Sequence, residues 1–118
     1  MFYLELLENQ MLKDQLKKRF KANFRHSEKI NETLAGFEKE YLRPLEKRIE
    51  DLSCCPEEQL PIDYIQIKRD LLEMHLWLEI FKEALTEMVS SVTLNAMNMR
   101  LQTDGAMLER LFNELAPF

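Results

Sequence analysis

The sequence predicts an all-α protein, and three observations support this fold class. Two glycines and four prolines in 118 residues are too few for the frequent turns of a β-sandwich. Strong helix formers such as Leu, Glu, Lys, Met and Gln are common along the chain. Apolar residues also recur at steps of three and four, the period of one helix face. We expect a long antiparallel helical hairpin with a short C-terminal helix, assembling as a helical bundle.

The size of the chain corresponds to one helical domain spanning residues 1–118. Its 46% hydrophobic and 31% charged residues exclude both a disordered and a membrane-embedded protein. The first eight residues contain two glutamates and no basic residue, unlike a secretory signal. No apolar stretch approaches the roughly 18 residues of a membrane-spanning helix. We therefore expect a cytoplasmic (intracellular) protein.

The clearest interruption lies at 53–61, where two prolines five residues apart exclude a regular helix. We place the principal turn there, between an N-terminal half (1–52) and a C-terminal half. Cys54 and Cys55 lie in this turn, and neighbouring cysteines are poorly placed to form a disulfide with each other. We expect reduced thiols, with an intermolecular disulfide as the alternative.

The strongest pattern in the sequence follows this turn. Apolar side chains recur at alternating spacings of three and four over four heptads, which predicts one helix over 62–100. With an axial rise of about 1.5 Å per residue, this helix would be a long rod. The residues of this seam are Tyr64, Ile67, Leu71, Met74, Leu78, Phe81, Leu85, Met88 and Val92.

The same helix is apolar beyond its seam. Eight of the eleven residues in 71–81 are apolar, and Trp77 and Ile80 lie off the seam. A helix that is apolar on most sides is buried on more than one side, so at least two helices, from this chain or a partner, must surround it. We expect two hairpins to combine as a homodimeric four-helix bundle. The expected partner or dimer interface is the seam together with Trp77 and Ile80.

The N-terminal half is less regular. An apolar stripe runs at helical spacing through Ile30, Leu34, Phe37, Tyr41, Leu45, Ile49 and Leu52. It lies on a different face from the preceding stripe of Leu12, Leu16, Phe20 and Phe24. Near residue 26 there is either one continuous helix or a break with Ser27 as the new N-cap. The absence of Gly and Pro favours the continuous helix, and Pro44 predicts a kink. At the other end of the chain, 103–105 reads as a turn before a short helix over 105–116.

A basic stripe lies in the N-terminal half. Its candidate contact residues for a polyanion are Lys13, Lys17, Lys18, Lys21, Arg25 and Lys29. Like charges at i+4 repel on a helix, so we expect an anionic partner for them.

Three partners for this stripe remain open. The favoured one is the acidic ridge of Glu79, Glu83 and Glu87, in this chain or in a second copy. The others are solvent, or an external nucleic acid or anionic membrane. The net charge of −5 counts against general nucleic-acid binding.

No residue pattern in the sequence predicts catalysis. The two histidines, His26 and His75, have no nucleophile and base at a recognisable spacing, and no Glu-x-x-His pair suggests a di-iron site. We expect no catalytic, cofactor or metal site and no small-molecule substrate. The expected function is non-enzymatic: an adaptor, chaperone or regulatory module that binds another protein or itself through helical faces. The alternative is binding to an anionic surface through residues 13–29.

Overall fold

The computed structural model describes residues 8–118, so the first seven residues of the predicted N-terminal half lie outside the described part. Over the described residues the chain is helical, with turns and no strand, which confirms the all-α class. The elements in chain order are α1 (Gln10–Asn23), α2 (Ser27–Phe37), the π-helical turn η1 (Glu38–Leu42), α3 (Arg43–Asp51), the 3₁₀ turn η2 (Leu52–Cys54), α4 (Leu60–Met88) and α5 (Ser91–Leu115).

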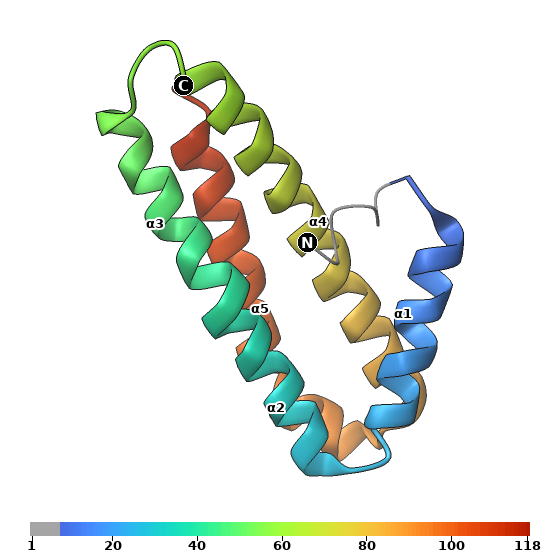
Figure 1. Ribbon diagram of the computed structural model, residues 1–118. Coiled ribbons are helices and arrows are strands. Elements are labelled where there is room, and N and C mark those ends of the chain that lie inside the picture. The colour runs from blue at the N-terminus through green and yellow to red at the C-terminus, as the bar shows by residue number, and fades with distance from the viewer. Residues whose placement is uncertain (1–7) are drawn as a thin grey trace.

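These elements form an elongated helical bundle (Figure 1). The segments α2, η1 and α3 follow one another in a single rod, and α4 and α5 run alongside it. The shorter α1 packs against α4. The loop between α3 and α4 lies at the same end of the bundle as the C-terminus. Among residues 8–118, no helix is both long and apolar enough to cross a lipid bilayer.

The helix predicted over 62–100 is in fact two helices. α4 ends at Met88, Val89 and Ser90 are extended, and α5 begins at Ser91. Serine and the β-branched residues that follow it are weaker helix formers, whereas Ser is a favoured N-cap. The Ser90 side chain accepts a hydrogen bond from the Thr93 backbone N–H at 3.4 Å. From this point α5 folds back along α4 (Figure 1).

The turn predicted at 103–105 and the separate short helix over 105–116 are likewise corrected. α5 passes through this segment without a break, and Gly105 does not have a positive φ. A glycine inside a helix costs about 1 kcal/mol relative to alanine. Burial of the apolar face of α5 outweighs that cost; its buried apolar residues are Met97, Leu101, Leu108, Leu111 and Leu115.

The continuous helix favoured for the N-terminal half was also wrong, because α1 and α2 are separate. His26, in extended conformation, is the N-cap of α2, and Ser27 is its first helical residue instead of its cap. Phe24 before the break and Ile30 after it are both buried. The change of direction thus brings two differently oriented apolar stripes into one core.

Pro44 produces a π turn instead of a simple kink. The backbone N–H of Arg43 bonds to the carbonyl of Glu38, five residues earlier, just before a proline that has no N–H to donate. The wider turn moves the core position by one residue. Leu42 is 1% exposed, whereas Tyr41, which the regular spacing places in the core, is only partly buried.

An aromatic cluster from three helices forms the centre of the core. The Trp77 ring of α4 stacks on Phe37 of α2 with centroids 4.2 Å apart, and it meets Phe20 of α1 edge to face at 5.1 Å. Phe24 and Phe81 complete the cluster, with centroids 4.9 Å apart. Such aromatic pairs each contribute about 0.5–1.5 kcal/mol beyond their buried area. Trp77 and Ile80, the off-seam residues of the predicted interface, are therefore covered by helices of the same chain, whereas Leu72 is 38% exposed.

Candidate functional site: a groove between α4 and α5

Most residues of the predicted interface lie in the core of this chain. The buried ones are Ile67, Leu71, Met74, Trp77, Leu78, Ile80, Phe81 and Leu85. Tyr64 is partly buried, while Met88 and Val92 are 37% and 77% exposed. α1 packs along α4 on one side and α5 on another. Most of the wide apolar surface on which the expected homodimer rested is thus already covered within one chain.

The centre of the basic stripe faces acidic residues of α4. The Nζ of Lys17 lies 2.7 Å from Glu87 Oε1 and 3.5 Å from Glu83 Oε2, and Lys21 pairs with the other oxygen of Glu87. The bond to Glu87 raises the pKa of Lys17, and the bonds from Lys17 and Lys21 lower the pKa of Glu87. These three contacts are the internal charge match that we favoured for the stripe. Glu79, the remaining acid of the predicted ridge, lines a groove on α4.

The rest of the stripe is arranged differently. Lys29 pairs within its own helix with Glu32, at 3.7 Å. Lys13, Lys18 and Arg25 form no ion pair with an acid among residues 8–118. The two aromatic rings beside these bases, Phe20 and Phe24, are buried. They are therefore not exposed to stack on nucleic-acid bases or to enter a lipid surface.

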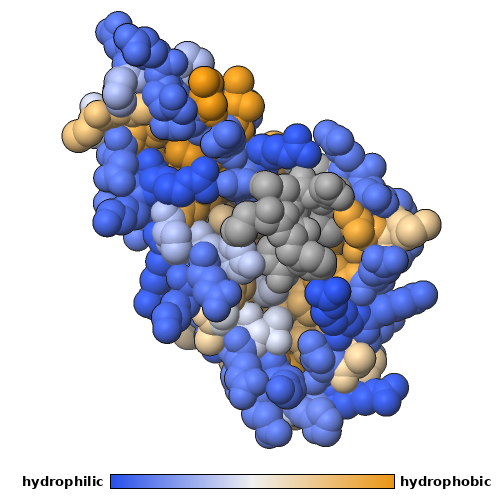
Figure 2. Space-filling model, in the orientation of Figure 1, coloured by the Kyte–Doolittle hydropathy of each residue, from blue (hydrophilic) through white to orange (hydrophobic). Residues whose placement is uncertain are grey.

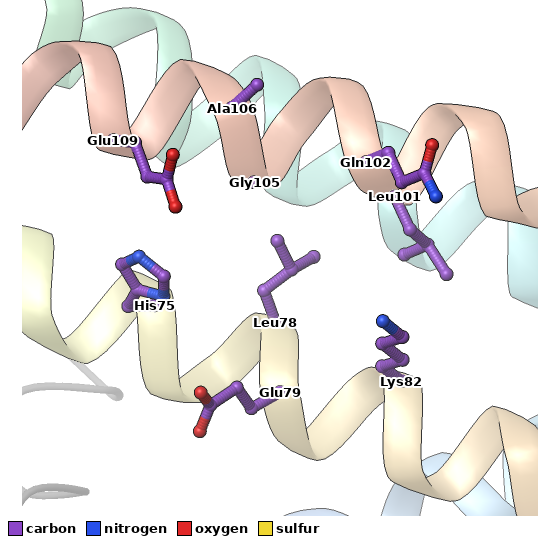
Figure 3. A pocket seen from close by; sticks show the side chains of 9 residues that line it. All are labelled: His75, Leu78, Glu79, Lys82, Leu101, Gln102, Gly105, Ala106 and Glu109. Carbon is purple, nitrogen blue, oxygen red and sulfur yellow. The ribbon is translucent and has the colours of Figure 1, made fainter.

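A groove with a volume of about 330 Å³ lies between α4 and α5 (Figure 3). Its apolar lining consists of Leu78 from α4 and Leu101, Gly105 and Ala106 from α5. Its polar lining consists of His75, Glu79, Lys82, Gln102 and Glu109. In Figure 3, Leu78 and Leu101 point into the space between the helices, with His75 and Glu109 toward one end and Lys82 and Gln102 toward the other.

The groove exists because α5 presents small residues where it passes Leu78. Gly105 has no side chain, and a Cβ added there would meet no atom within 4 Å. Ala106 contributes a single methyl group to the same lining. A larger side chain at position 105 would occupy the space, whereas the Ala106 methyl group points away from α4 in Figure 3. The groove is thus left open by the missing side chain at Gly105.

The chemistry of the groove suits an apolar group with positive charge nearby. An apolar floor with a few polar groups at its edge is typical of binding sites. Two of the charged edge residues, Glu79 and Glu109, are acidic, and one, Lys82, is basic. Glu79 also lines a neighbouring hollow on α4 with Lys82, Glu83 and Glu87, of which the last two pair with lysines of α1. In the described part of the chain, His, Cys, Asp and Glu form no group of three or more that could hold a metal ion.

A buried acidic residue lies one position before the groove glycine. Asp104 is 5% exposed, and its Oδ2 has no hydrogen-bond partner. Glu38 of the π turn is next to it, and the Nε of Arg100 donates to both oxygens of Glu38 at 3.2 Å. Burial, then the hydrogen bond and charge of Glu38, raise the pKa of Asp104 to about 7. Burial would raise the pKa of Glu38 too, but hydrogen bonds from Arg100 and Asp104 lower it.

The two cysteines are free thiols in the structure. Cys54 is exposed, and the partly buried Cys55 donates to Asp63 Oδ2 at 3.2 Å. Burial and the neighbouring Asp63 carboxylate raise the pKa of the Cys55 thiol. A raised pKa keeps the Cys55 thiol protonated and less reactive.

Sequence reasoning missed both the groove and the buried acid, although one signal for the acid was present. The buried positions of α5 follow the spacing 4, 3, 4, 3, 4 through Met97, Leu101, Asp104, Leu108, Leu111 and Leu115. Asp104 therefore occupies a core position of a helix. The sequence Asp104–Gly105 resembles a turn, and this local signal concealed the longer period.

Comparisons with protein-family models, curated proteins and solved structures give no match for this chain.

Proposed function

We propose that this chain is a non-enzymatic protein-binding module that receives a basic amphipathic helix in the groove between α4 and α5. The observation that carries the proposal is the combination of an apolar floor, made by Leu78, Leu101 and Gly105, with an acidic edge. The expected class of function, protein binding through helical faces, is retained. The binding surface we propose is the groove instead of the predicted seam of α4, because most of that seam is buried in the core.

The shape of the groove supports a helical partner. Two neighbouring helices with a groove between them form the usual receptor for an amphipathic helix, which inserts apolar side chains spaced three or four residues apart. About 330 Å³ is at the lower end of the range for ligand pockets. This volume suits one apolar anchor side chain better than a large cofactor. The polar residues on both sides of the floor would then contact the flanks of the bound helix.

The charges around the groove support a basic partner. Glu79 and Glu109 line it, against one lysine, Lys82. The whole chain carries a net charge of −5. An excess of one sign of charge speeds the association of an oppositely charged partner and selects against partners of like charge. Lys or Arg residues flanking the apolar anchor would meet this acidic edge.

Two synthetic helical peptides test the proposal. Each has about 14 residues, four helical turns, with Leu on one face and either Lys or Glu on the other. The measurement is fluorescence anisotropy of the labelled peptide at moderate ionic strength. We expect the Leu/Lys peptide to bind and the Leu/Glu peptide to remain free. Equal affinity of the two peptides, or binding of neither, would overturn the proposal.

A pair of glycine substitutions locates the binding. Gly105→Leu places a side chain in the groove and should weaken Leu/Lys binding about tenfold or more, equivalent to about 1.4 kcal/mol. Gly36→Leu on α2 is the matched control, since a Cβ at either glycine meets no atom within 4 Å. The control should bind like the unchanged protein. If both variants bound equally well, the peptide would occupy another surface.

A further inference from the structure

Asp104 connects the groove with the π turn through one turn of α5. Leu101 and Gly105 line the groove on the side facing α4. Asp104, between them in sequence, is buried and interacts with Glu38 of the π turn. A movement of α5 that changes the contact of Asp104 with Glu38 would therefore also move two groove residues.

Of the two neighbouring carboxyl groups, Glu38 has a guanidinium partner and Asp104 has none in contact. Arg100 on α5 is engaged with both oxygens of Glu38, and Arg43 at the start of α3 contributes only through its charge. The Oδ2 of Asp104 receives no donor. Arg100 therefore contacts the Glu38 carboxyl group directly, whereas it acts on Asp104 only through its charge.

α4 packs on another side of α5 and supplies no charge to Asp104. Its ionisable groups His75, Glu79 and Lys82 line the groove, and Glu73 is buried. The helix thus brings no second cation to the carboxyl pair.

We propose that Asp104 and Glu38 hold one proton between them, and that its loss moves α5 relative to the π turn and so changes the groove between α4 and α5. With the proton bound, the Asp104 hydroxyl donates to the Glu38 carboxylate. When the proton leaves to solvent, two carboxylates lie side by side with little water to screen them, and they repel. Separation of α5 from η1 relieves that repulsion.

The direction of the pH effect follows from the environment of each acid. Burial and Glu38 raise the pKa of Asp104 to about 7 from an ordinary value of 3.8, so Asp104 is the group that holds the proton. The change in α5 is then expected near neutral pH, with the compact arrangement on the acidic side. Because the proton would regulate the proposed binding site, this inference rests on the proposed function. Its first test needs no ligand.

The test is a ¹³C NMR titration of the unchanged protein. We expect the Asp104 carboxyl carbon to titrate near pH 7 and the methyl groups of Leu101 and Leu78 to shift with the same midpoint. An Asp104 carboxyl that titrates like an ordinary aspartate, near pH 4, would overturn the proposal. Leucine methyls that do not change over that pH range would also overturn it, because the groove would then be uncoupled from the proton.

Two variants separate this proton from others near the groove. Asp104→Asn should abolish the shift of the Leu101 methyl. His75→Gln is the control, because the ionisable ring of His75 also lines the groove; the Leu101 shift should survive in this variant. Loss of the shift in His75→Gln, or its persistence in Asp104→Asn, would assign the transition to another group.

Peptide binding provides a separate test of regulation. The affinity of the Leu/Lys peptide should differ between pH 6 and pH 8, about one unit on either side of the expected midpoint, and Asp104→Asn should remove the difference. If the methyl groups respond but the peptide binds at neither pH, the proton site stands and the proposed function fails. If the peptide binds but Asp104 titrates as an ordinary acid, the proposed function stands and this inference fails.

Discussion

The Nζ of Lys17 in α1 lies 2.7 Å from the Oε1 of Glu87, the penultimate residue of α4. This ion pair, with those of Lys17 to Glu83 and Lys21 to Glu87, fixes how far α1 extends along α4. The apolar contacts between the same helices include the edge-to-face pair of Phe20 and Trp77. The charged contacts thus add a specific alignment to the otherwise apolar interface between α1 and α4.

Charge reversal tests this alignment. Glu87→Lys should lower the melting temperature, because it places a third cation beside Lys17 and Lys21, and adding Lys17→Glu should recover part of the loss. Both effects should shrink in high salt, since exposed charges are screened. Lys18→Glu is the control, because Lys18 is exposed and forms no ion pair with an acid among residues 8–118. An equal loss in the control would indicate a general charge effect instead of a specific pair.

Neighbouring leucines of α4 should differ greatly in their contribution to stability. Leu71 is fully buried, whereas Leu72 is 38% exposed. We expect Leu71→Ala to lower the free energy of unfolding by about 2–5 kcal/mol through lost burial and a residual cavity. Leu72→Ala should cost less than about 1 kcal/mol. Urea unfolding followed by the fluorescence of Trp77, the single tryptophan, measures both; similar losses would contradict the observed packing of α4.

The N-cap of α5 is expected to contribute measurably to stability. The Ser90 hydroxyl accepts from the Thr93 N–H, and Ser90 is extended, as an N-cap requires. Ser90→Ala should lower the free energy of unfolding by about 0.5–2 kcal/mol, and Ser90→Gly by only a few tenths. Thermal unfolding by circular dichroism gives the comparison. If Ser90→Ala were neutral, the turn between α4 and α5 would depend on packing alone.

Stability should decrease as the pH rises toward 8. Asp104 has a raised pKa in the folded state, about 7 against 3.8, so the folded state binds a proton that the unfolded state has released between those values. This contribution is present in full below the unfolded pKa and is lost as the pH rises through 7. We expect a loss of about 2 kcal/mol between pH 5.5 and 8. The comparison is urea unfolding of the unchanged protein and Asp104→Asn, which should lack this part of the slope; identical slopes would contradict the assignment.

The fold class could be predicted from the sequence, but the path of the chain could not. Helical spacing is a local property, and it continues in phase from Met88 to Val92 although the chain reverses direction between them. Val92 is 77% exposed, so the apparent seam residue is on the outside of a different helix. Ser90 was the usable signal, but a serine inside a long periodic pattern is weaker evidence than glycine or proline.

The candidate site was harder to predict than the fold, for two physical reasons. The apolar pattern of residues 71–81 shows that neighbouring helices must bury Trp77 and Ile80. It does not show whether those helices belong to the same chain or to another. A groove depends on side chains that are missing, as at Gly105, and a small residue leaves no periodic signal. The match between Lys17 and Glu87 could be predicted because both stripes are regular and opposite in charge.

The hydrophobic face of the α2–α3 rod passes from Phe37 to Leu42 in a step of five residues. Elsewhere on this face the steps are three or four. The π turn therefore contains one residue more than an α-helical turn would need to keep the same face inward. Loss of one residue between Phe37 and Leu42 would shorten that step to four and leave both side chains facing inward. In α4 or α5 the same deletion would rotate every later side chain by about 100°. The π turn is thus where this protein's length can change while its interior keeps its pattern.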